Sequence, residues 1–297
     1  MEPPTLIQSF KTTNKPIRSI AFNNKQTQLC IGSDETSVLC WNLTPPIRSL
    51  KFIGHTAAVT STCFGQSVLV TGSADQTVRV WTPNVRGDSI FKKAHSKPIR
   101  SVDISRDQRH ILTASDDKSI KLFDIDLNFK CNFNGHMNWV RCAKFSADQR
   151  LVASVADDNT LRMFDVRTQN QIMCIGQDQG LTTQLRKLQF SEDGTFVAVC
   201  GLQDVQLWDV RSSQLLQHYS CTSGQVNDVC FGGGDKYMIA GTDQGLKILD
   251  VKRGRSLYTI KGHEGPVTSV AYSPDGSVIA SGGQDGRVLL FEVNDME

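Results

Sequence analysis

GHTAAVTSTCFGQSVLVTGSADQTVRVW, residues Gly54–Trp81, is the stretch that decides the fold. It holds three short runs rich in β-branched residues, near Val59–Phe64, Val68–Thr71 and Thr77–Trp81. Small or polar residues separate these runs, and such spacing predicts three β-strands joined by turns.

The same pattern recurs along the whole chain, so the chain is built from repeats. The apolar residue that starts the first strand returns at intervals of 42, 40, 41, 45, 41 and 41 residues, at Ile17, Val59, Ile99, Val140, Leu185, Val226 and Val267. The place of Trp81 is taken in turn by Trp41, Trp81, Phe123, Phe164, Trp208, Leu249 and Phe291. A period of about 41 residues, with GH near its start and WD near its end, resembles the WD40 repeat, in which each blade of a β-propeller has four strands.

This resemblance implies an all-β, seven-bladed propeller over the single domain 1–297. The expected repeats run roughly over residues 11–50, 51–91, 92–132, 133–173, 174–217, 218–259 and 260–297. After Phe291 too few residues remain for a fourth strand. We therefore expect Thr5–Phe10 to complete the last blade by pairing near Arg287–Glu292, which would remove two open sheet edges.

Four residues of the second repeat match the polar positions that carry the family's structural hydrogen-bond chain: His55, Ser73, Asp75 and Trp81. Imidazole and indole groups need hydrogen-bond partners once they are buried, and Asp75 can supply an acceptor. A Ser/His/Asp catalytic triad is the alternative interpretation. It is disfavoured because the set recurs between repeats and because no G-x-S-x-G motif is present.

Other function classes find little support in the sequence. There is no HExxH motif, no cluster of metal ligands and no nucleophile motif, so we expect neither an enzyme nor a bound metal or cofactor. The nine cysteines have no CxxC spacing and are expected to be buried thiols in a reducing compartment. A net charge of +2 gives no argument for nucleic acid, and no apolar run is long enough for a membrane span.

The resemblance also indicates where partners bind, because WD40 relatives gather binding residues on the top face at fixed positions of the repeat. Here those positions include four arginines and three aspartates: Arg18, Arg100, Arg141, Arg186, Asp34, Asp116 and Asp157. We expect a mixed ring that is most basic over blades 3 to 5. Arg–Asp pairing between neighbouring blades is the alternative role for these side chains.

Trp139 is the most distinctive single residue, because it lies in the loop HMNWVRC where the repeat does not require an apolar residue. An exposed tryptophan is a typical anchor of a protein interface. The alternative is that Trp139 packs down on the neighbouring blade.

Several stretches are similar to one subfamily, the proteome-of-centriole WD40 proteins of centrioles and basal bodies. They are TVRVWTPNVRGDS (Thr77–Ser89), HMNWVRCAKFSADQR (His136–Arg150), LLQHY (Leu215–Tyr219), LKILD (Leu246–Asp250) and GRSLYTIKGHEGP (Gly254–Pro266). The resemblance implies a cytoplasmic, cytoskeletal scaffold protein that binds tubulin or inner-scaffold proteins and supports microtubule triplets and cilium assembly. It also implies oligomerisation through a C-terminal coiled coil, which is absent from this chain.

Two other functions stay open. WDVR (Trp208–Arg211) and FDVR (Phe164–Arg167) resemble the W-D-x-R box of substrate receptors of cullin-type ubiquitin ligases. A general cytosolic adaptor is the other possibility.

Overall fold

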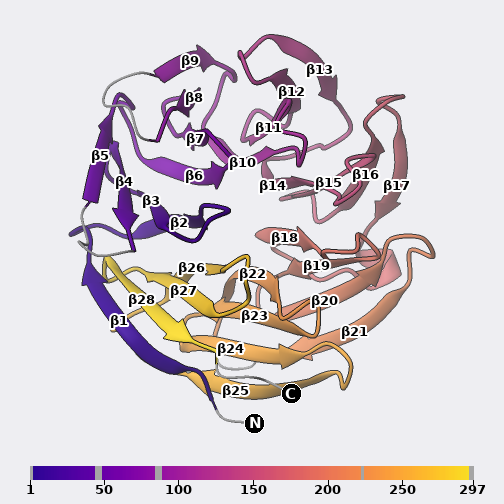
Figure 1. Cartoon of the computed structure of the whole chain (residues 1–297). Coiled ribbons are helices and arrows are strands. Elements are labelled where there is room, and N and C mark those ends of the chain that lie inside the picture. Colours follow the sequence, from indigo (N-terminus) through magenta and orange to yellow (C-terminus); the bar gives the residue numbers. More distant parts are fainter. Residues whose placement is uncertain (1–2, 44–48, 84–88, 222–223, 294–297) are drawn as a thin grey trace.

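The β-branched runs form antiparallel strands, and four strands at a time hydrogen-bond into one sheet. The computed structural model describes residues 3–43, 49–83, 89–221 and 224–293. In this part of the chain, 28 strands form seven four-stranded sheets. The sheets stand around a common axis as the blades of a propeller (Figure 1). The predicted all-β, seven-bladed fold is therefore confirmed.

Each blade is named here by its strands, from the innermost to the outermost. Blade 1 consists of β2 (Ile17–Phe22), β3 (Gln28–Ser33), β4 (Ser37–Asn42) and β5 (Ser49–Ile53). Blade 2 consists of β6 (Val59–Phe64), β7 (Leu69–Ser73), β8 (Thr77–Trp81) and β9 (Ser89–Lys93). Blade 3 consists of β10 (Ile99–Ile104), β11 (His110–Ser115), β12 (Ile120–Asp124) and β13 (Phe129–Phe133). Blade 4 consists of β14 (Val140–Phe145), β15 (Leu151–Ala156), β16 (Leu161–Asp165) and β17 (Gln171–Ile175).

The remaining blades follow the same order. A short 3-10 helix, η1 (Gln177–Gln179), precedes blade 5, which consists of β18 (Lys187–Phe190), β19 (Phe196–Cys200), β20 (Asp204–Asp209) and β21 (Leu215–Ser220). Blade 6 consists of β22 (Val226–Gly232), β23 (Tyr237–Thr242), β24 (Gly245–Asp250) and β25 (Arg255–Ile260). Blade 7 consists of β26 (Val267–Tyr272), β27 (Val278–Gly283), β28 (Arg287–Glu292) and, from the other end of the chain, β1 (Thr5–Lys11).

The first strand closes the ring, as the sequence predicts. β1 runs antiparallel to β28, with Thr5 opposite Glu292 and Lys11 opposite Arg287. In Figure 1 the indigo strand β1 lies along the outer edge of the yellow strand β28. The contact continues past the strand, where the backbone N–H groups of Thr12 and Thr13 donate to the carbonyl oxygen of Gly286.

The apolar core lies between the blades. Seven clusters of buried apolar side chains occur in the described residues, and each one combines side chains from two neighbouring blades. Between blades 4 and 5, for example, Met163 of β16 packs with Phe190 of β18 and Trp208 of β20. An apolar content of 39 % is sufficient because each interface is a thin layer of alternating side chains.

Inner-strand side chains also pin one blade to the next. At five junctions, an oxygen from one blade accepts a backbone N–H from the following inner strand: Ser19 from Thr62, Ser61 from Val102, Asp103 from Phe145, Asp228 from Val270 and Ser269 from Ile20. At the third of these junctions the Lys144 Nζ lies 2.9 Å from Asp103 Oδ1. Burial alone would lower the pKa of Lys144, but Asp103 together with the nearby Cys63 and Cys142 outweighs burial and raises this pKa.

Closure by β1 can be tested through Phe10, which is 9 % exposed and stacks on Trp41 with ring centroids 5.2 Å apart. Phe10→Ala should lower the free energy of unfolding in urea by about 3 kcal/mol, because a buried aromatic ring is lost and a cavity remains. The control is Ile7→Ala in the same strand, where the side chain is 51 % exposed. Its effect should stay within about 0.5 kcal/mol. Equal effects of the two substitutions would show that β1 does not seal blade 7.

Candidate functional site

The residue that follows the first apolar residue of an inner strand occupies a β-bulge in six of the seven blades. The pairing of the inner strand with its neighbour skips one residue in each: Arg18, Thr60, Arg100, Arg141, Asn227 and Thr268. In blade 5 the corresponding Arg186 immediately precedes β18. A bulge re-aims a side chain, so side chains at one register of the repeat all turn toward the same end of the central axis.

There they line one cavity of about 710 Å³, to which every blade contributes. Six of the predicted binding residues line it: Arg18, Asp34, Arg100, Arg141, Asp157 and Arg186. Asp116 and Trp139 do not line it, although both lie next to residues that do. We call the four arginines together with Asp34, Asp116 and Asp157 the arginine ring.

Three of the four arginines form forked ion pairs with an aspartate. Arg18 donates from Nε and Nη2 to the two carboxylate oxygens of Asp34, at 2.7 and 2.6 Å. Arg100 pairs with Asp116 and Arg141 with Asp157 in the same manner. Each pair joins the inner strand to the end of the second strand of the same blade. The Arg–Asp pairing considered as the alternative role therefore does occur, but its placement between neighbouring blades is wrong, because the bulge turns the arginine back over its own sheet.

Arg186 is the exception in the ring. It donates to Gln225 Oε1 at 2.6 Å and to Asn227 Oδ1 at 3.0 Å, both in blade 6. These acceptors are uncharged, so the positive charge of Arg186 is not neutralised by its partners. Lys187 lines the cavity beside it and forms no ion pair within the described residues. The cavity is thus most basic at blade 5.

Trp139 lies at the edge of the ring and is 38 % exposed. The guanidinium carbon of Arg141 lies 5.2 Å from the centre of its ring, which is a cation–π contact. Met137, two residues earlier in the same loop, is 74 % exposed. The loop before β14 therefore carries two accessible apolar side chains, one of which, Trp139, contacts the arginine of the Arg141–Asp157 ion pair.

In blade 2 the hydrogen-bond chain runs through a different hydroxyl group from the predicted one. His55 Nδ1 lies 2.8 Å from Asp75 Oδ2, and His55 Nε2 lies 2.8 Å from Thr71 Oγ1. Trp81 Nε1 donates to the same Thr71 oxygen at 2.9 Å. An ionised carboxylate only accepts, so Nδ1–H donates to Asp75 and, in a neutral ring, Nε2 accepts from Thr71.

The predicted Ser73 is therefore wrong as a member of this chain. Its hydroxyl donates to the Ala57 carbonyl oxygen at 3.2 Å and accepts from the Asp75 N–H, so it shapes the turn that presents Asp75. The sequence did contain a signal that favours Thr71 over Ser73. A hydroxyl group stands at the register of Thr71 in the other three blades that keep the histidine, namely Thr113, Ser154 and Ser281. The register of Ser73 holds Ala156 in blade 4 and Gly283 in blade 7.

Blades 3, 4 and 7 keep the histidine, the hydroxyl and the aspartate but have phenylalanine in place of Trp81. Burial alone would raise the pKa values of Asp75, Asp117 and Asp158. Hydrogen bonds from the neighbouring histidine and hydroxyl groups outweigh burial and hold these pKa values well below the usual range. The carboxylates are thus ionised at neutral pH and accept from the loop that carries each histidine.

Blade 5 replaces the chain with one that the sequence did not reveal. Gln206 Oε1 accepts from Trp208 Nε1 at 3.3 Å and from the backbone N–H of Thr182 at 3.1 Å. Asp204 accepts from the hydroxyl group of Thr182 and lies 2.8 Å from His218 Nε2. Leu181, at the register of the histidine, is buried in the apolar cluster between blades 4 and 5. In blade 1 the register of Thr71 holds Ile31, and the indole N–H of Trp41 has no hydrogen-bond partner among the residues that the structure describes.

The described residues contain neither a candidate metal cluster nor a candidate membrane-spanning helix. No group of three or more His, Cys, Asp or Glu side chains there is placed to hold a metal ion. The same residues contain no helix with the length and apolar character needed to cross a bilayer.

Comparison with known proteins agrees with this geometry. A family model described as "WD domain, G-beta repeat" matches residues 4–42, 45–82, 88–124, 128–165 and 254–292, which is more than half of the chain. The unmatched part contains blade 5, where Leu181 replaces the histidine, and the first three strands of blade 6, where Leu249 replaces the tryptophan.

Similar proteins carry several different names. The chain is 27 % identical to "Serine-threonine kinase receptor-associated protein" of Dictyostelium discoideum, over 94 % of this chain and 96 % of that protein. It is 25 % identical to the Homo sapiens protein of the same name, over 81 % of this chain and 68 % of that protein. It is 26 % identical to "Pre-mRNA-processing factor 19" of Oryza sativa subsp. japonica, over 94 % of this chain but 55 % of that protein.

The role of Thr71 gives a stability prediction. Thr71→Val keeps the shape of the side chain but leaves both His55 Nε2 and Trp81 Nε1 without a partner. We expect a loss of about 2–4 kcal/mol in the free energy of unfolding, since each stranded buried polar group costs about 1–3 kcal/mol. Thr113→Val in blade 3 is the matched control, because Phe123 has no donor and only His95 is stranded. Denaturation curves that give a loss for Thr113→Val as large as for Thr71→Val would contradict the bridging role of Thr71.

His95 gives a pH prediction. Burial lowers the pKa of His95 and outweighs the opposing effect of Asp117, and Lys121 lowers this pKa further. The unfolded chain therefore binds a proton at this residue more readily than the folded chain. The contribution of His95 to stability should be complete above pH of about 6.5 and should fall as the pH drops below that value. Urea midpoints between about pH 7 and pH 5 should show a flatter slope for His95→Gln than for the parent. An unchanged slope in His95→Gln would contradict the prediction.

Proposed function

Because the chain belongs to the WD40 repeat family, we propose that it is a non-catalytic scaffold that binds partner proteins through the arginine ring and Trp139. The observation that carries this proposal is the combination found at blade 4. The exposed ring of Trp139 lies against Arg141, whose orientation is already fixed by a forked ion pair, and the same loop carries the exposed side chain of Met137.

The ion pairs are suited to recognition more than to stability. In the Arg18–Asp34 and Arg141–Asp157 pairs both side chains are partly exposed, and such pairs contribute only about 0–1 kcal/mol to folding, whereas in the third pair Asp116 is buried. In Arg18, Arg100 and Arg141 the aspartate uses Nε and Nη2, which leaves Nη1 for a partner. A guanidinium group held in place loses little freedom on binding, and its remaining donors suit a carboxylate or a backbone carbonyl group.

Arg186 and Lys187 add the uncompensated positive charge of the ring. A partner that places an acidic side chain over blade 5 and an apolar one over Trp139 and Met137 would match both features. Aromatic anchors supply most of the energy of a small interface, while charges around them set its orientation and association rate.

For the cellular setting, we propose a structural role at centrioles and basal bodies, with tubulin or inner-scaffold proteins as partners. This rests on the resemblance of Thr77–Ser89, His136–Arg150 and Gly254–Pro266 to the centriolar subfamily. The acidic surface of tubulin would suit the basic part of the ring. The names of the similar proteins support a broader second candidate, a cytosolic adaptor in signalling or RNA-processing assemblies. The hypothesis that the chain is a substrate receptor of a cullin-type ubiquitin ligase is supported only by the sequences WDVR and FDVR.

The docking surface is tested by Met137→Ala combined with Trp139→Ala. This double variant should keep the parent melting temperature, since both side chains are exposed, and should lose at least about tenfold in affinity for captured partners. The matched control is Ile172→Ala with Leu216→Ala, which removes apolar side chains that are 56 % and 45 % exposed on outer strands. The control should retain partners and location.

Proximity labelling and fluorescence microscopy in a ciliated cell then separate the settings. Enrichment of tubulin and centriolar proteins, lost in the Met137/Trp139 variant, is the expected result. If the Met137/Trp139 variant keeps the partners and the Ile172/Leu216 control loses them, the docking surface lies on the outer strands and not at the arginine ring. Labelling of receptor-kinase or RNA-processing proteins would favour the adaptor candidate over the centriolar one.

A further inference from the structure

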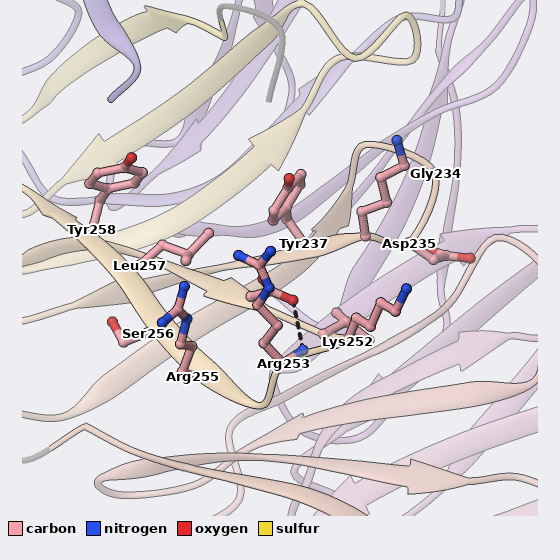
Figure 2. Close-up of a pocket in the computed structure, with 12 residues that line it drawn as sticks. Gly234, Asp235, Tyr237, Lys252, Arg253, Arg255, Ser256, Leu257 and Tyr258 are labelled. Atoms are coloured by element: carbon pink, nitrogen blue, oxygen red, sulfur yellow. Dashed lines mark hydrogen bonds and ion pairs between the residues drawn. The ribbon is translucent and has the colours of Figure 1, made fainter. Parts of the chain in front are cut away.

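A second cavity, of about 800 Å³, lies at the opposite end of blade 6 from the arginine ring. It is lined by the turn between β22 and β23, the turn between β24 and β25, and the first residues of β25 (Figure 2). The arginine ring lies where the inner strands begin. The turn after β22 lies where an inner strand ends, which places this cavity on the other face of the propeller.

Four cations line this cavity: Lys236, Lys252, Arg253 and Arg255. Figure 2 shows the side chain of Arg253, from the β24–β25 turn, near that of Arg255, the first residue of β25. Lys236, Lys252 and Arg255 are exposed and form no ion pair within the described residues.

The two carboxylates in the lining are already engaged by the protein. Asp250 accepts from the backbone N–H of Arg253 at 2.8 Å, and its carboxylate lies 3.8 Å from Arg253 Nε. Asp235 accepts from the backbone N–H groups of Glu192 and Asp193 in blade 5. Three cations are therefore available to a negatively charged ligand.

The shape of the site favours an extended chain. A neighbouring cavity of about 390 Å³ shares Gly234, Lys236 and Tyr237 and continues to the Ser273–Gly276 turn of blade 7. β25 is the outermost strand of its sheet and pairs only with β24. An edge strand offers backbone N–H and C=O groups to an extended peptide, while neighbouring pockets select its side chains.

The lining also favours a protein over a nucleic acid. Leu257 and Tyr258 present apolar surface beside the cations. Glu192 and Asp275 border the continuation of the groove. They would repel the charge that a phosphate backbone carries at every nucleotide, whereas a peptide can place uncharged residues there and keep its carboxylates beside the cations. An extended peptide that carries both carboxylate and apolar side chains can pair with the cations and also pack on Leu257 and Tyr258.

We propose that this groove on blade 6 is a second docking site, which takes an extended acidic segment of a partner protein. Lys236, Lys252 and Arg255 bind its carboxylates, and Leu257 and Tyr258 contact its apolar side chains. The scaffold then engages partners on both faces of the ring at once.

The test uses a short fluorescent peptide in which Glu alternates with Tyr and Thr, and an analogue in which every Glu is Gln. By fluorescence anisotropy, the full chain should bind the Glu peptide at least about tenfold more tightly than the analogue. Lys252→Glu with Arg255→Glu should weaken that binding at least about tenfold. The matched control reverses Arg167 and Arg211, which are exposed on the corresponding turns of blades 4 and 5. The affinity of this control for the Glu peptide should stay within about twofold of the parent affinity, because its net charge changes by the same amount but outside the groove.

All variants are first checked for an unchanged melting temperature. Equal binding of the Glu and Gln peptides would overturn the proposal, as would equal losses in the two charge-reversal variants. A single-stranded RNA that binds the parent as tightly as the Glu peptide, and is lost in the Lys252/Arg255 variant, would replace the protein ligand with a nucleic acid. Loss of the Glu peptide in the Met137/Trp139 variant alone would assign its binding to the arginine ring.

Discussion

The whole structure depends on contact between neighbouring sheets. Each apolar cluster in the described residues draws on two blades, so no blade buries its faces by itself. A ring satisfies this constraint because every blade then has two neighbours. Side chains of the inner strands reinforce it, as where the Thr60 hydroxyl lies within hydrogen-bond distance of carbonyl oxygens in blades 2 and 3, those of Gly72 and Ile99. Thr268 makes the equivalent contacts in blade 7 and to Ile17 of blade 1.

The arginine ring follows from the same architecture. A bulge at one register of the repeat turns a side chain toward the axis, and repetition brings several such side chains to one opening. Short hydroxyl and amide side chains at this register bind the next blade, as Asn227 does to the carbonyl oxygen of Val267. Arginines at this register instead pair with an aspartate of their own blade or, in the case of Arg186, with amides of the next. Sequence changes at this one position therefore exchange a structural contact for a recognition surface.

Much of this could be predicted from the sequence, because the repeat fixes both strand period and blade number. The pairing of β1 with β28 followed from counting strands, and the convergence of the arginines followed from their common register. The bulge itself could not be predicted, since it is a property of backbone pairing and any residue type can occupy it. For the same reason the sequence placed the Arg–Asp pairs between neighbouring blades, whereas each pair lies within one blade. Thr71 was missed in favour of Ser73 because both are hydroxyls on one strand, and only the pleat decides which one faces His55 and Trp81. Gln206 was missed because it restores the hydrogen bond of Trp208 with a different functional group.

The pairing of β1 with β28 also constrains how the molecule forms. Thr12 and Gly286, which are hydrogen-bonded, are separated by 274 positions along the chain. Of the strands of the propeller, β1 is synthesised first and β28 last, so blades 1 to 6 must wait with two open interfaces, one on each side of the missing blade 7. Contacts between such distant residues carry a high loop-closure entropy and are typical of slow folding. Until that step the apolar faces of blades 1 and 6 that later cover blade 7 remain open to other chains, which makes the final strand pairing the point at which this protein is most dependent on chaperones.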